Sequence, residues 1–378
     1  MLDVAQAPPA GFEEITPVAT SGTIYPGLIE LHNHLSYDVL PLWQVPHRFT
    51  NRGGWSVGPT YRSLISGPMG ILGRTAGLPE AVVRYVEAKA LLGGTTTSQG
   101  IALYSDAGIR HLYYGACPNV ETTHDPDLPN AVTRIGDVAA RDAASFSVEQ
   151  AHATSLILHL AEGTDAVAEG HFQALYQPPP IDRWAIERSL AGIHCVPLVR
   201  ADFDVLAANG ASMVWLPLSN LLLYGQTADI GAARAAGVRI GIGSDWSPSG
   251  SKNLLAELKV ARILGGLPDR DLIAIATIDA AAILRWEGHL GSLEAGKRAD
   301  LIVVAGTGDD PYGHLLEARE TDLELVMIDG VTRVATQGLM TALGSGVPTE
   351  SLAVGSTTRL ARSSSSTTAT KRPPKLIG

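Results

Sequence analysis

Short apolar runs rich in β-branched residues alternate along this chain with longer segments in which apolar residues recur at helical spacing. This alternation predicts repeated βα units and a parallel sheet. The runs with the strand pattern lie at 23–31, 95–100, 111–116, 131–136, 155–160, 191–198, 212–218 and 238–245. Eight such units within roughly 250 residues match the size of an α/β fold of the (β/α)₈ TIM-barrel type.

Helical patterns fill the intervals between these runs, and some end at a glycine, which suits the position after a helix C-terminus. The helical segments include 81–94, 165–176, 202–210 and 228–237. Beyond the last barrel strand the pattern predicts helices at 254–266 and 268–286, and then strands at 299–306 and within 323–336. These last strands predict a small β-domain outside the barrel.

The composition excludes several classes of partner. The formal net charge is −10 and the body of the chain has no dense cluster of Lys and Arg, so a nucleic-acid-binding face is not expected. Cys117 and Cys195 are the only cysteines, too few for a disulfide framework or a cysteine zinc site. The N-terminus lacks the pattern of a signal peptide, and no run of about 18 apolar residues occurs. We therefore expect a cytoplasmic protein without a membrane partner.

Several histidines follow predicted barrel strands. His32 and His34 share one side of the first strand, because residues two apart point the same way. His159, His194 and Asp245 also lie at C-terminal strand ends, where the active sites of this fold are found. Taken singly, each has a structural explanation, such as a helix N-cap for Asp245. Together they predict a metal site, because buried polar groups cost free energy unless paired, and imidazole and carboxylate suit Zn²⁺, Fe²⁺ or Mn²⁺.

These residues lie in a series of motifs that resembles the amidohydrolase superfamily. The stretch YPGLIELHNH resembles the family's first-strand motif, HLAEG its fifth, GIHC its sixth and GIGSDW its eighth. LPLSNLLLYG after the seventh strand and GSLEAGKRADLIVV from Gly291 extend the resemblance over most of 23–336. The resemblance implies a (β/α)₈ barrel with a small β-sandwich domain formed by the chain ends.

The pattern and the resemblance together divide the chain into four parts. They are 1–22, an N-terminal remnant of the sandwich; 23–290, the hydrolase barrel; 291–340, the C-terminal sandwich strands; and 341–378, a low-complexity, disordered tail. Relatives commonly carry several sandwich strands before the barrel. The 22 residues before Thr23 are therefore expected to complete this small domain only in part.

The spacing of ligands separates branches of the superfamily. No lysine lies between Lys89 and Lys252, which excludes the carboxylated-lysine bridge usual in binuclear members. The spacing from His159 to Glu162 instead resembles the mononuclear branch of cytosine deaminase, S-adenosylhomocysteine deaminase and the triazine hydrolases. The resemblance implies one divalent metal ion, zinc first with iron or manganese as alternatives, and as its ligands His32, His34, His159 and Asp245.

The chemistry that follows is hydrolysis by a metal-activated water, because Zn²⁺ lowers the pKa of a bound water to about 7. Asp245 is placed to accept a proton from that water, and Glu162 to carry a proton to the departing nitrogen or a ring nitrogen. His194 is placed to donate to the oxygen of the tetrahedral intermediate. The structural alternative for Glu162 is an exposed loop carboxylate.

The segment 36–77 matches no loop of these deaminases. We predict that it is an ordered lid over the substrate, because a long loop with large aromatic residues is typical of a lid. The candidate substrate contacts on it are Trp43, His47, Arg48, Trp55 and Tyr61. A plain surface role is equally compatible with His47 and Arg48. Further candidates, from the motifs after the seventh and eighth strands, are Ser219, Asn220 and Trp246.

The predicted function is hydrolysis of a C–N bond in a small molecule, most directly deamination of a cyclic amidine or aminated heterocycle. Hydrolysis of an amide or a lactam-type ring would use the same residues. A non-catalytic scaffold with the same fold is the alternative of another class, but such proteins normally lose metal ligands, and this chain keeps them all. Self-association into a homo-oligomer is compatible with either function.

Overall fold

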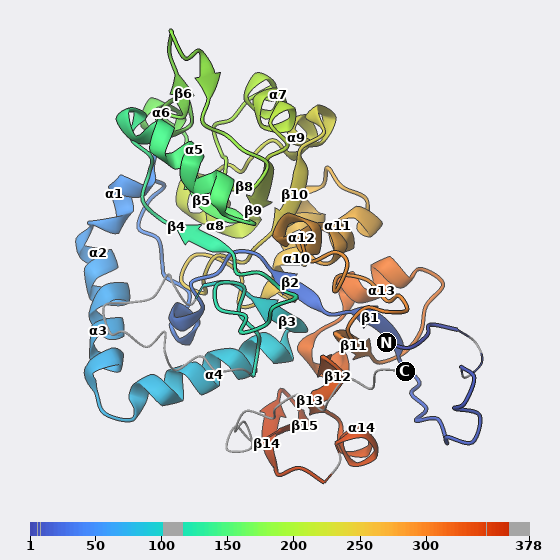
Figure 1. Cartoon of the computed structure of the whole chain (residues 1–378). Helices are drawn as coiled ribbons and strands as arrows, with labels where there is room; N and C mark the ends of the chain where they lie inside the picture. The colour runs from blue at the N-terminus through green and yellow to red at the C-terminus, as the bar shows by residue number, and fades with distance from the viewer. Residues whose placement is uncertain (6, 8, 101–115, 345, 363–378) are drawn as a thin grey trace.

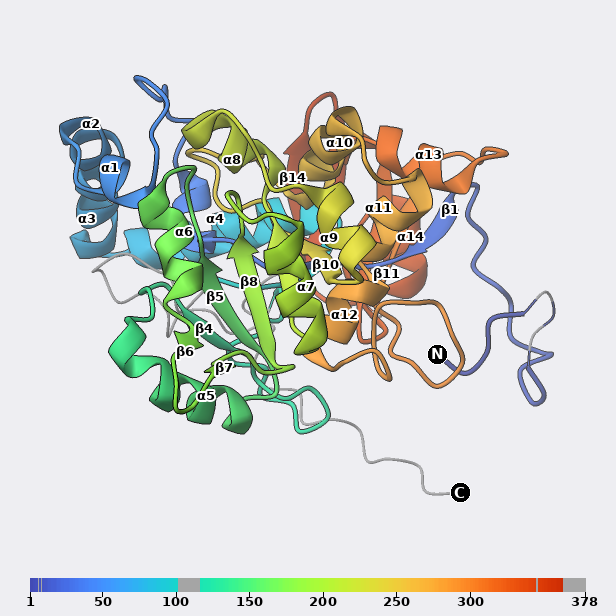
Figure 2. The ribbon, with the colours of Figure 1, turned by 90° about the horizontal axis from the view of Figure 1, so that it is seen from above.

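The computed structural model describes residues 1–362 apart from 6, 8, 101–115 and 345. Its centre is a barrel of parallel strands, shown in Figure 1 and from above in Figure 2. Five strands pair in the order β10-β9-β8-β5-β4, and β2 pairs with β3. Their bounds are β2 Leu28–Glu30, β3 Thr95–Ser98, β4 Val132–Arg134, β5 Leu156–Leu160, β8 Leu190–His194, β9 Ser212–Trp215 and β10 Arg239–Ile242. Every residue of β5 and β8 is buried, as expected of parallel strands covered on both faces.

The third predicted strand, 111–116, lies outside the described residues except for Ala116. Residues 118–120 join β3 to β4 in the described part of the barrel. The N–H of Val120 donates to the carbonyl of Ser98 at 3.0 Å, and the N–H of Ala131 donates to the carbonyl of Val120 at 2.7 Å.

The first and last strands close the barrel on the other side. Asn33 pairs with Asp245 in a parallel bridge just beyond the ends of β2 and β10. The N–H of Asp245 donates to the carbonyl of His32 at 3.0 Å, and the N–H of His34 donates to the carbonyl of Asp245 at 2.6 Å. We call this pairing the seam of the barrel. It joins the backbones of three residues predicted to hold the metal.

The first predicted strand, 23–31, is divided between two sheets. β1 (Thr23–Pro26) pairs antiparallel with β11 (Leu301–Val304), whereas β2 belongs to the barrel. Gly27 separates them at a close approach, because a Cβ there would lie 2.2 Å from Oγ1 of Thr96. The barrel strand therefore begins at Leu28 and not at Thr23, since the Pro-Gly step moves the chain from one sheet to the other.

Helices cover the outside of the barrel, as Figure 2 shows for α5, α6 and α7 beside β5 and β8. The elements of this layer and its loops are α4 Leu78–Leu92, η4 Ala140–Asp142, α5 Ala143–His152, α6 Ala166–Gln173, β6 Tyr176–Gln177, β7 Arg183–Trp184, α7 Arg200–Ala208, α8 Pro217–Tyr224, α9 Ile230–Ala236, α10 Leu254–Leu264, α11 Asp269–Ile275 and α12 Ile278–Leu284. The helix predicted at 268–286 is two helices, α11 and α12. The break between them leaves the carbonyl of Ala276 free to accept the N–H of Ile29 in β2.

The chain ends form a six-stranded antiparallel sheet in the order β1-β11-β12-β13-β15-β14. The described strands of the chain ends form this single sheet, and not the two facing sheets of the predicted sandwich. Its remaining elements are α13 Pro311–Glu317, η5 Glu320–Asp322, β12 Leu323–Ile328, β13 Val331–Ala335, α14 Gln337–Leu343, β14 Thr349–Val354 and β15 Thr357–Arg362. One face buries Ile302 and Val326 in the main core, and the other packs Val303 and Leu325 around Met340 of α14.

The prediction of a disordered tail from 341 was wrong for its first part. α14 continues to Leu343, and the hairpin of β14 and β15 adds two strands to the second sheet. Threonine and valine favour strands where a sheet edge is available, and β13 offers that edge, pairing Val334 with Ala361. Residues 363–378 lie outside the described part of the chain. The other domain limits remain predictions.

The segment 36–77 carries short helices, and Figure 1 shows α1, α2 and α3 along one side of the barrel. Its elements are η1 Leu35–Val39, α1 Arg52–Ser56, α2 Pro59–Tyr61, η2 Arg62–Ser66 and α3 Gly67–Arg74. Trp43, Trp55 and Met69 pack in one cluster with Tyr224 and Trp246 of the barrel loops. In the described part of the chain, no helix has both the length and the apolar character needed to cross a bilayer.

Candidate active site

Four histidines meet at the C-terminal end of the barrel strands. His32 and His34 follow β2, His159 lies in β5, and His194 ends β8. The ring centroid of His32 lies 5.1 Å from that of His34, 4.7 Å from that of His159 and 6.1 Å from that of His194. Only His34 is partly exposed, while the other three are buried. The structure therefore brings together four histidines that the sequence placed on three different strands.

Oxygen acceptors orient three of these rings. Nδ1 of His32 lies 3.1 Å from Oε1 of Gln99, and Nδ1 of His194 lies 2.9 Å from Oδ1 of Asn220. Nδ1 of His159 lies 3.4 Å from the carbonyl of Arg134. Amide and carbonyl oxygens only accept, so in each ring Nδ1 carries a proton and Nε2 is the atom that faces the site. Partners of this kind commonly orient histidine ligands around a metal ion.

The spacing of the ligand atoms fits a divalent metal ion. Nε2 of His32 lies 3.2 Å, and Nε2 of His34 3.6 Å, from Oδ1 of Asp245. The ligand atoms of His32, His34 and His159 all lie within 4.8 Å of one another. Ligands at about 2.1 Å from a tetrahedral Zn²⁺ are about 3.4 Å apart. Nε2 of His32 is also a buried atom with no hydrogen-bond partner among the described residues, which a metal ion would satisfy.

The charge states of these groups suit ligation as well. Burial lowers the pKa of His159 well below its usual value, and the nearby His32 and His194 lower it further. His159 is therefore neutral and keeps a lone pair. For Asp245, burial favours the neutral form, but the surrounding histidines, His32 first and then His194 and His34, outweigh burial and lower the pKa below its usual value. Asp245 is therefore ionised, as a carboxylate ligand must be.

Glu162 lies beside the ligand cluster and is held from three sides. The hydroxyl of Tyr224 donates to Oε1 of Glu162 at 2.6 Å, and Nη1 of Arg52 lies 3.5 Å from Oε2. Nε2 of His194 also lies 3.5 Å from Oε2. The indole N–H of Trp55 in turn donates to the hydroxyl of Tyr224 at 2.8 Å. Glu162 is buried, so it is not the exposed loop carboxylate of the structural alternative.

A second ligand triad overlaps the first. The ligand atoms of His159, Glu162 and His194 also lie within 4.8 Å of one another. Glu162 could therefore act as a metal ligand or as a proton carrier, and its geometry alone is compatible with both roles.

The backbone is strained where the site residues leave the barrel. Ala161, His194 and Asp245 have φ values of 53°, 71° and 65°. Such left-handed conformations cost of the order of 1–3 kcal/mol for a non-glycine residue and persist only where the surroundings enforce them. At Asp245 the side chain is also fixed, because the hydroxyl of Ser219 donates a short hydrogen bond to Oδ2.

A cavity of about 280 Å³ opens above the cluster and is roofed by the lid segment 36–77. Its floor includes His34, His159, Glu162, His194 and Asp245. Its walls are largely aromatic and include Tyr37, Trp55, Tyr61 and Trp246. Trp246 lies 5.8 Å from Trp55 and 6.1 Å from Tyr61 between ring centroids. The cavity thus suits a planar molecule held against aromatic rings.

The other candidate substrate contacts do not line this cavity. Trp43 is buried behind Trp55, at 6.5 Å between ring centroids. His47 and Arg48 are exposed, and the His47 ring packs on Phe49 at 4.4 Å.

Ser219 and Asn220 are fully buried and contact Asp245 and His194, so they lie behind these two residues and not in the wall of the cavity.

Sequence reasoning missed Tyr37 in the cavity wall and three residues that contact predicted site residues. Gln99 orients His32, Tyr224 holds Glu162, and Arg52 lines the cavity and pairs with Asp137 at 2.6 Å as well as with Glu162. Gln99 could have been predicted as a site residue, because it lies near the C-terminal end of the predicted strand 95–100, at the same end of the barrel as the histidines. Arg52 lies on the segment 36–77 and carried no such signal. Tyr224 lies in the motif LPLSNLLLYG, but nothing in that motif indicated its contact with Glu162.

Comparison with known proteins agrees with this geometry. The model of the amidohydrolase family matches residues 138–333, more than half of the chain. A 5-methylthioadenosine/S-adenosylhomocysteine deaminase of Desulforudis audaxviator is 31% identical over 197 residues, which cover 46% of this chain and 45% of that protein. The chain spans about half the length of the curated relatives it matches.

Solved structures show the same fold. An adenosine deaminase from Xanthomonas campestris with bound zinc aligns with a TM-score of 0.61 at 19% identity, covering 86% of this chain and 84% of that one. Atrazine chlorohydrolase from Arthrobacter aurescens TC1, complexed with zinc, aligns with a TM-score of 0.61 at 20% identity, covering 83% and 84%. The (β/α)₈ barrel with its ligand-bearing strand ends and the match over more than half of the sequence lead to one conclusion: this chain belongs to the amidohydrolase family.

Proposed function

We propose that this protein is a metal-dependent hydrolase that removes an amino group from a small aminated heterocycle and releases ammonia. The observation that carries the proposal is the convergence of His32, His34, His159 and Asp245 at the floor of an aromatic cavity, with Glu162 and His194 beside them. The relatives named as deaminases support the choice of reaction. Zinc is the metal we propose, because three imidazoles and one carboxylate are ligands it accepts readily.

A divalent ion at this site would make water acidic enough to supply hydroxide near neutral pH. Asp245, ionised and fixed by Ser219, takes up the proton released there. Glu162 then passes a proton to the heterocycle or to the departing nitrogen, and Tyr224 holds its carboxylate in place. Because Asn220 accepts from Nδ1 of His194, the other nitrogen of that ring faces Glu162 and the developing charge on the substrate.

The lid explains why a planar substrate is favoured. Trp55, Tyr61 and Trp246 present ring surfaces to the cavity, and Trp55 closes it against bulk water. Amide and lactam-type rings remain the alternative substrates, because the same polar groups would serve them. A cytoplasmic location and self-association also remain predictions.

The proposal is tested by measuring metal content and ammonia release on the same preparation. We expect about one equivalent of Zn, Fe or Mn per chain, and ammonia release from at least one nucleobase, nucleoside, aminotriazine or cyclic amidine. Release of an acid without ammonia from lactams would favour the ring-hydrolysis alternative. A protein that binds no metal after growth with each of the three would be a scaffold, and the proposal would fail.

Truncation of Trp55 separates the lid's role in binding from a role in folding. Stacking of a heterocycle on an aromatic ring contributes about 1–3 kcal/mol. Trp55→Ala is therefore expected to raise KM roughly 5- to 100-fold, with a smaller fall in kcat, in steady-state kinetics with the substrate found above. The fall in kcat follows from the lost hydrogen bond between Trp55 and Tyr224.

Trp43→Ala is the matched control, because Trp43 packs in the same cluster but does not line the cavity. It should lower the melting temperature and leave KM unchanged in the folded fraction. If both variants change only the melting temperature, the segment 36–77 is a structural cap and does not contact the substrate.

A further inference from the structure

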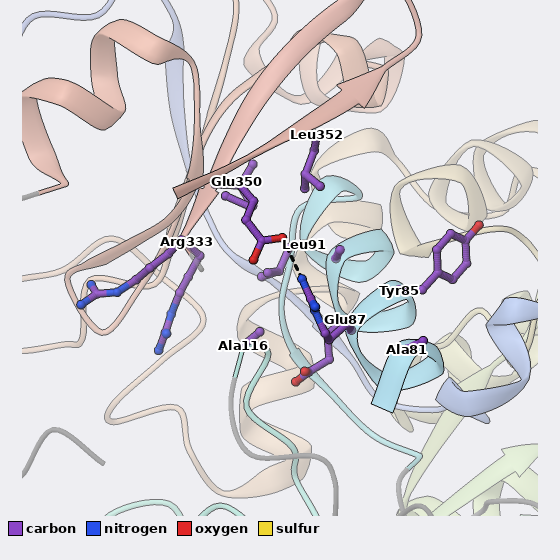
Figure 3. Close-up of a pocket in the computed structure, with 13 residues that line it drawn as sticks. Ala81, Tyr85, Glu87, Leu91, Ala116, Arg333, Glu350 and Leu352 are labelled. Carbon is purple, nitrogen blue, oxygen red and sulfur yellow. Dashed lines mark hydrogen bonds and ion pairs between the residues drawn. The ribbon is translucent and has the colours of Figure 1, made fainter. Parts of the chain in front are cut away.

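A second cavity, of about 350 Å³, lies between α4 and the antiparallel sheet and shares no lining residue with the active site. Figure 3 shows Glu87 and Leu91 on α4 facing Arg333 and Glu350 on the sheet. Most of its surface is apolar, and the residues that make it so include Ala81, Leu91, Val334, Leu352 and Ala361. A cavity of this volume lies within the range that binds small organic molecules.

Only some of the charged groups around this cavity form ion pairs. Arg84 and Glu350 pair at 2.7 Å across its rim, where both side chains are about half exposed. Arg333 is mostly buried, yet among the described residues it makes no ion pair and no side-chain hydrogen bond, and its Nε is a buried atom without a partner. Arg362 lines the same cavity and likewise has no partner in the described ranges.

Burying a guanidinium without an ion-pair partner costs folding free energy. A buried charge loses hydration, and natural proteins pair such a charge or bring it against a ligand. Burial lowers the pKa of Arg333 and the neighbouring Arg362 lowers it further, while the nearby Asp300 and Glu87 act in the opposite direction without pairing with it; a guanidinium stays protonated in proteins. The cavity is lined by Arg84, Arg333 and Arg362 against Glu87 and Glu350, and this excess of cations beside an apolar wall suits a molecule with one anionic end and an apolar body.

We propose that this cavity is a binding site for a small amphipathic carboxylate, whose anionic group pairs with Arg333 and whose apolar part lies between α4 and the hairpin of β14 and β15. The guanidinium of Arg333 offers a planar fork of donors that matches a carboxylate. Leu91 and Leu352, from opposite walls, enclose the chain of the ligand. The site is separate from the hydrolytic centre, and it does not depend on the function proposed for that centre.

The test uses octanoate as the probe and octanamide as its neutral counterpart, with the metal-loaded full-length protein in isothermal titration calorimetry. Octanoate is expected to bind the wild-type protein more tightly than octanamide. A hydrogen bond to a charged group contributes enough to change an affinity about tenfold to a hundredfold. Arg333→Gln should therefore raise the Kd for octanoate by that factor and leave the Kd for octanamide unchanged.

Two further variants serve as controls. Leu352→Trp fills the cavity without changing its charge and should weaken the binding of both probes. Arg270→Gln removes an exposed arginine elsewhere and should weaken the binding of neither probe. Thermal unfolding shows whether each variant is folded. The proposal is overturned if the folded wild type does not bind octanoate. It is also overturned if folded Arg333→Gln and Leu352→Trp bind octanoate as tightly as the wild type does, which is the result expected if octanoate binds at the active-site metal.

Discussion

Replacing His32 by alanine is expected to remove most of the bound metal and nearly all of the activity. His32 contributes a buried Nε2 that faces Asp245 at 3.2 Å, and Gln99 fixes its ring. Loss of even an outer partner of a metal ligand commonly lowers metal affinity or activity about 10- to 100-fold, and loss of the ligand itself should exceed that. Asp245→Ala and His34→Ala should behave in the same way. Metal content is measured by elemental analysis after dialysis, and activity by ammonia release.

His152→Ala is the control for this series. His152 ends α5, is exposed, and lies outside both ligand triads. It should keep full metal content and activity. Full metal content together with wild-type turnover in His32→Ala or Asp245→Ala would contradict the assignment of these residues as metal ligands.

The second large effect is expected for Glu162→Gln, which should lower kcat about 10²- to 10⁴-fold while metal content stays near that of the wild type. Glutamine has the shape of glutamate and can still accept from Tyr224, but it cannot carry a proton. Steady-state kinetics and elemental analysis of the same sample measure the two quantities.

The overlapping triad of His159, Glu162 and His194 supplies the competing outcome. If Glu162→Gln loses metal in parallel with activity, Glu162 is a ligand, and a second metal ion bridged by its carboxylate becomes the better description. Tyr224→Phe is the matched variant, since it removes the hydrogen bond to Glu162 and the one from Trp55 but leaves the carboxylate in place. It should lower kcat by less than Glu162→Gln and keep the metal.

The ligand cluster was predictable because parallel strands of a barrel place their C-terminal ends together. His32, His159 and Asp245 could therefore be assigned to one site from strand positions alone. Arg52 and Tyr224 could not, because their contacts with Glu162 depend on how the lid and α8 fold back over the barrel, which no local pattern encodes.

The fold shows the same division between local pattern and tertiary context. Apolar periodicity located β5, β8, β9 and β10, whose neighbours are also their sequence neighbours in the βα order. It did not separate β1 from β2, because both strands are apolar and only their pairing partners differ. The threonine-rich hairpin at the end of the described chain gains its strand structure from the edge of β13, which composition does not reveal.

The seam makes the site depend on contacts between distant parts of the chain. Asp245 meets His32 and His34 where the last barrel strand joins the first, more than 200 residues later in the chain. Closing so long a loop is entropically costly and is completed only when the intervening strands are in register. The carboxylate of Asp245 therefore reaches the two histidines only when the first and last strands meet. A divalent ion held by His32, His34 and Asp245 would therefore link the first and last strands of the barrel across the seam.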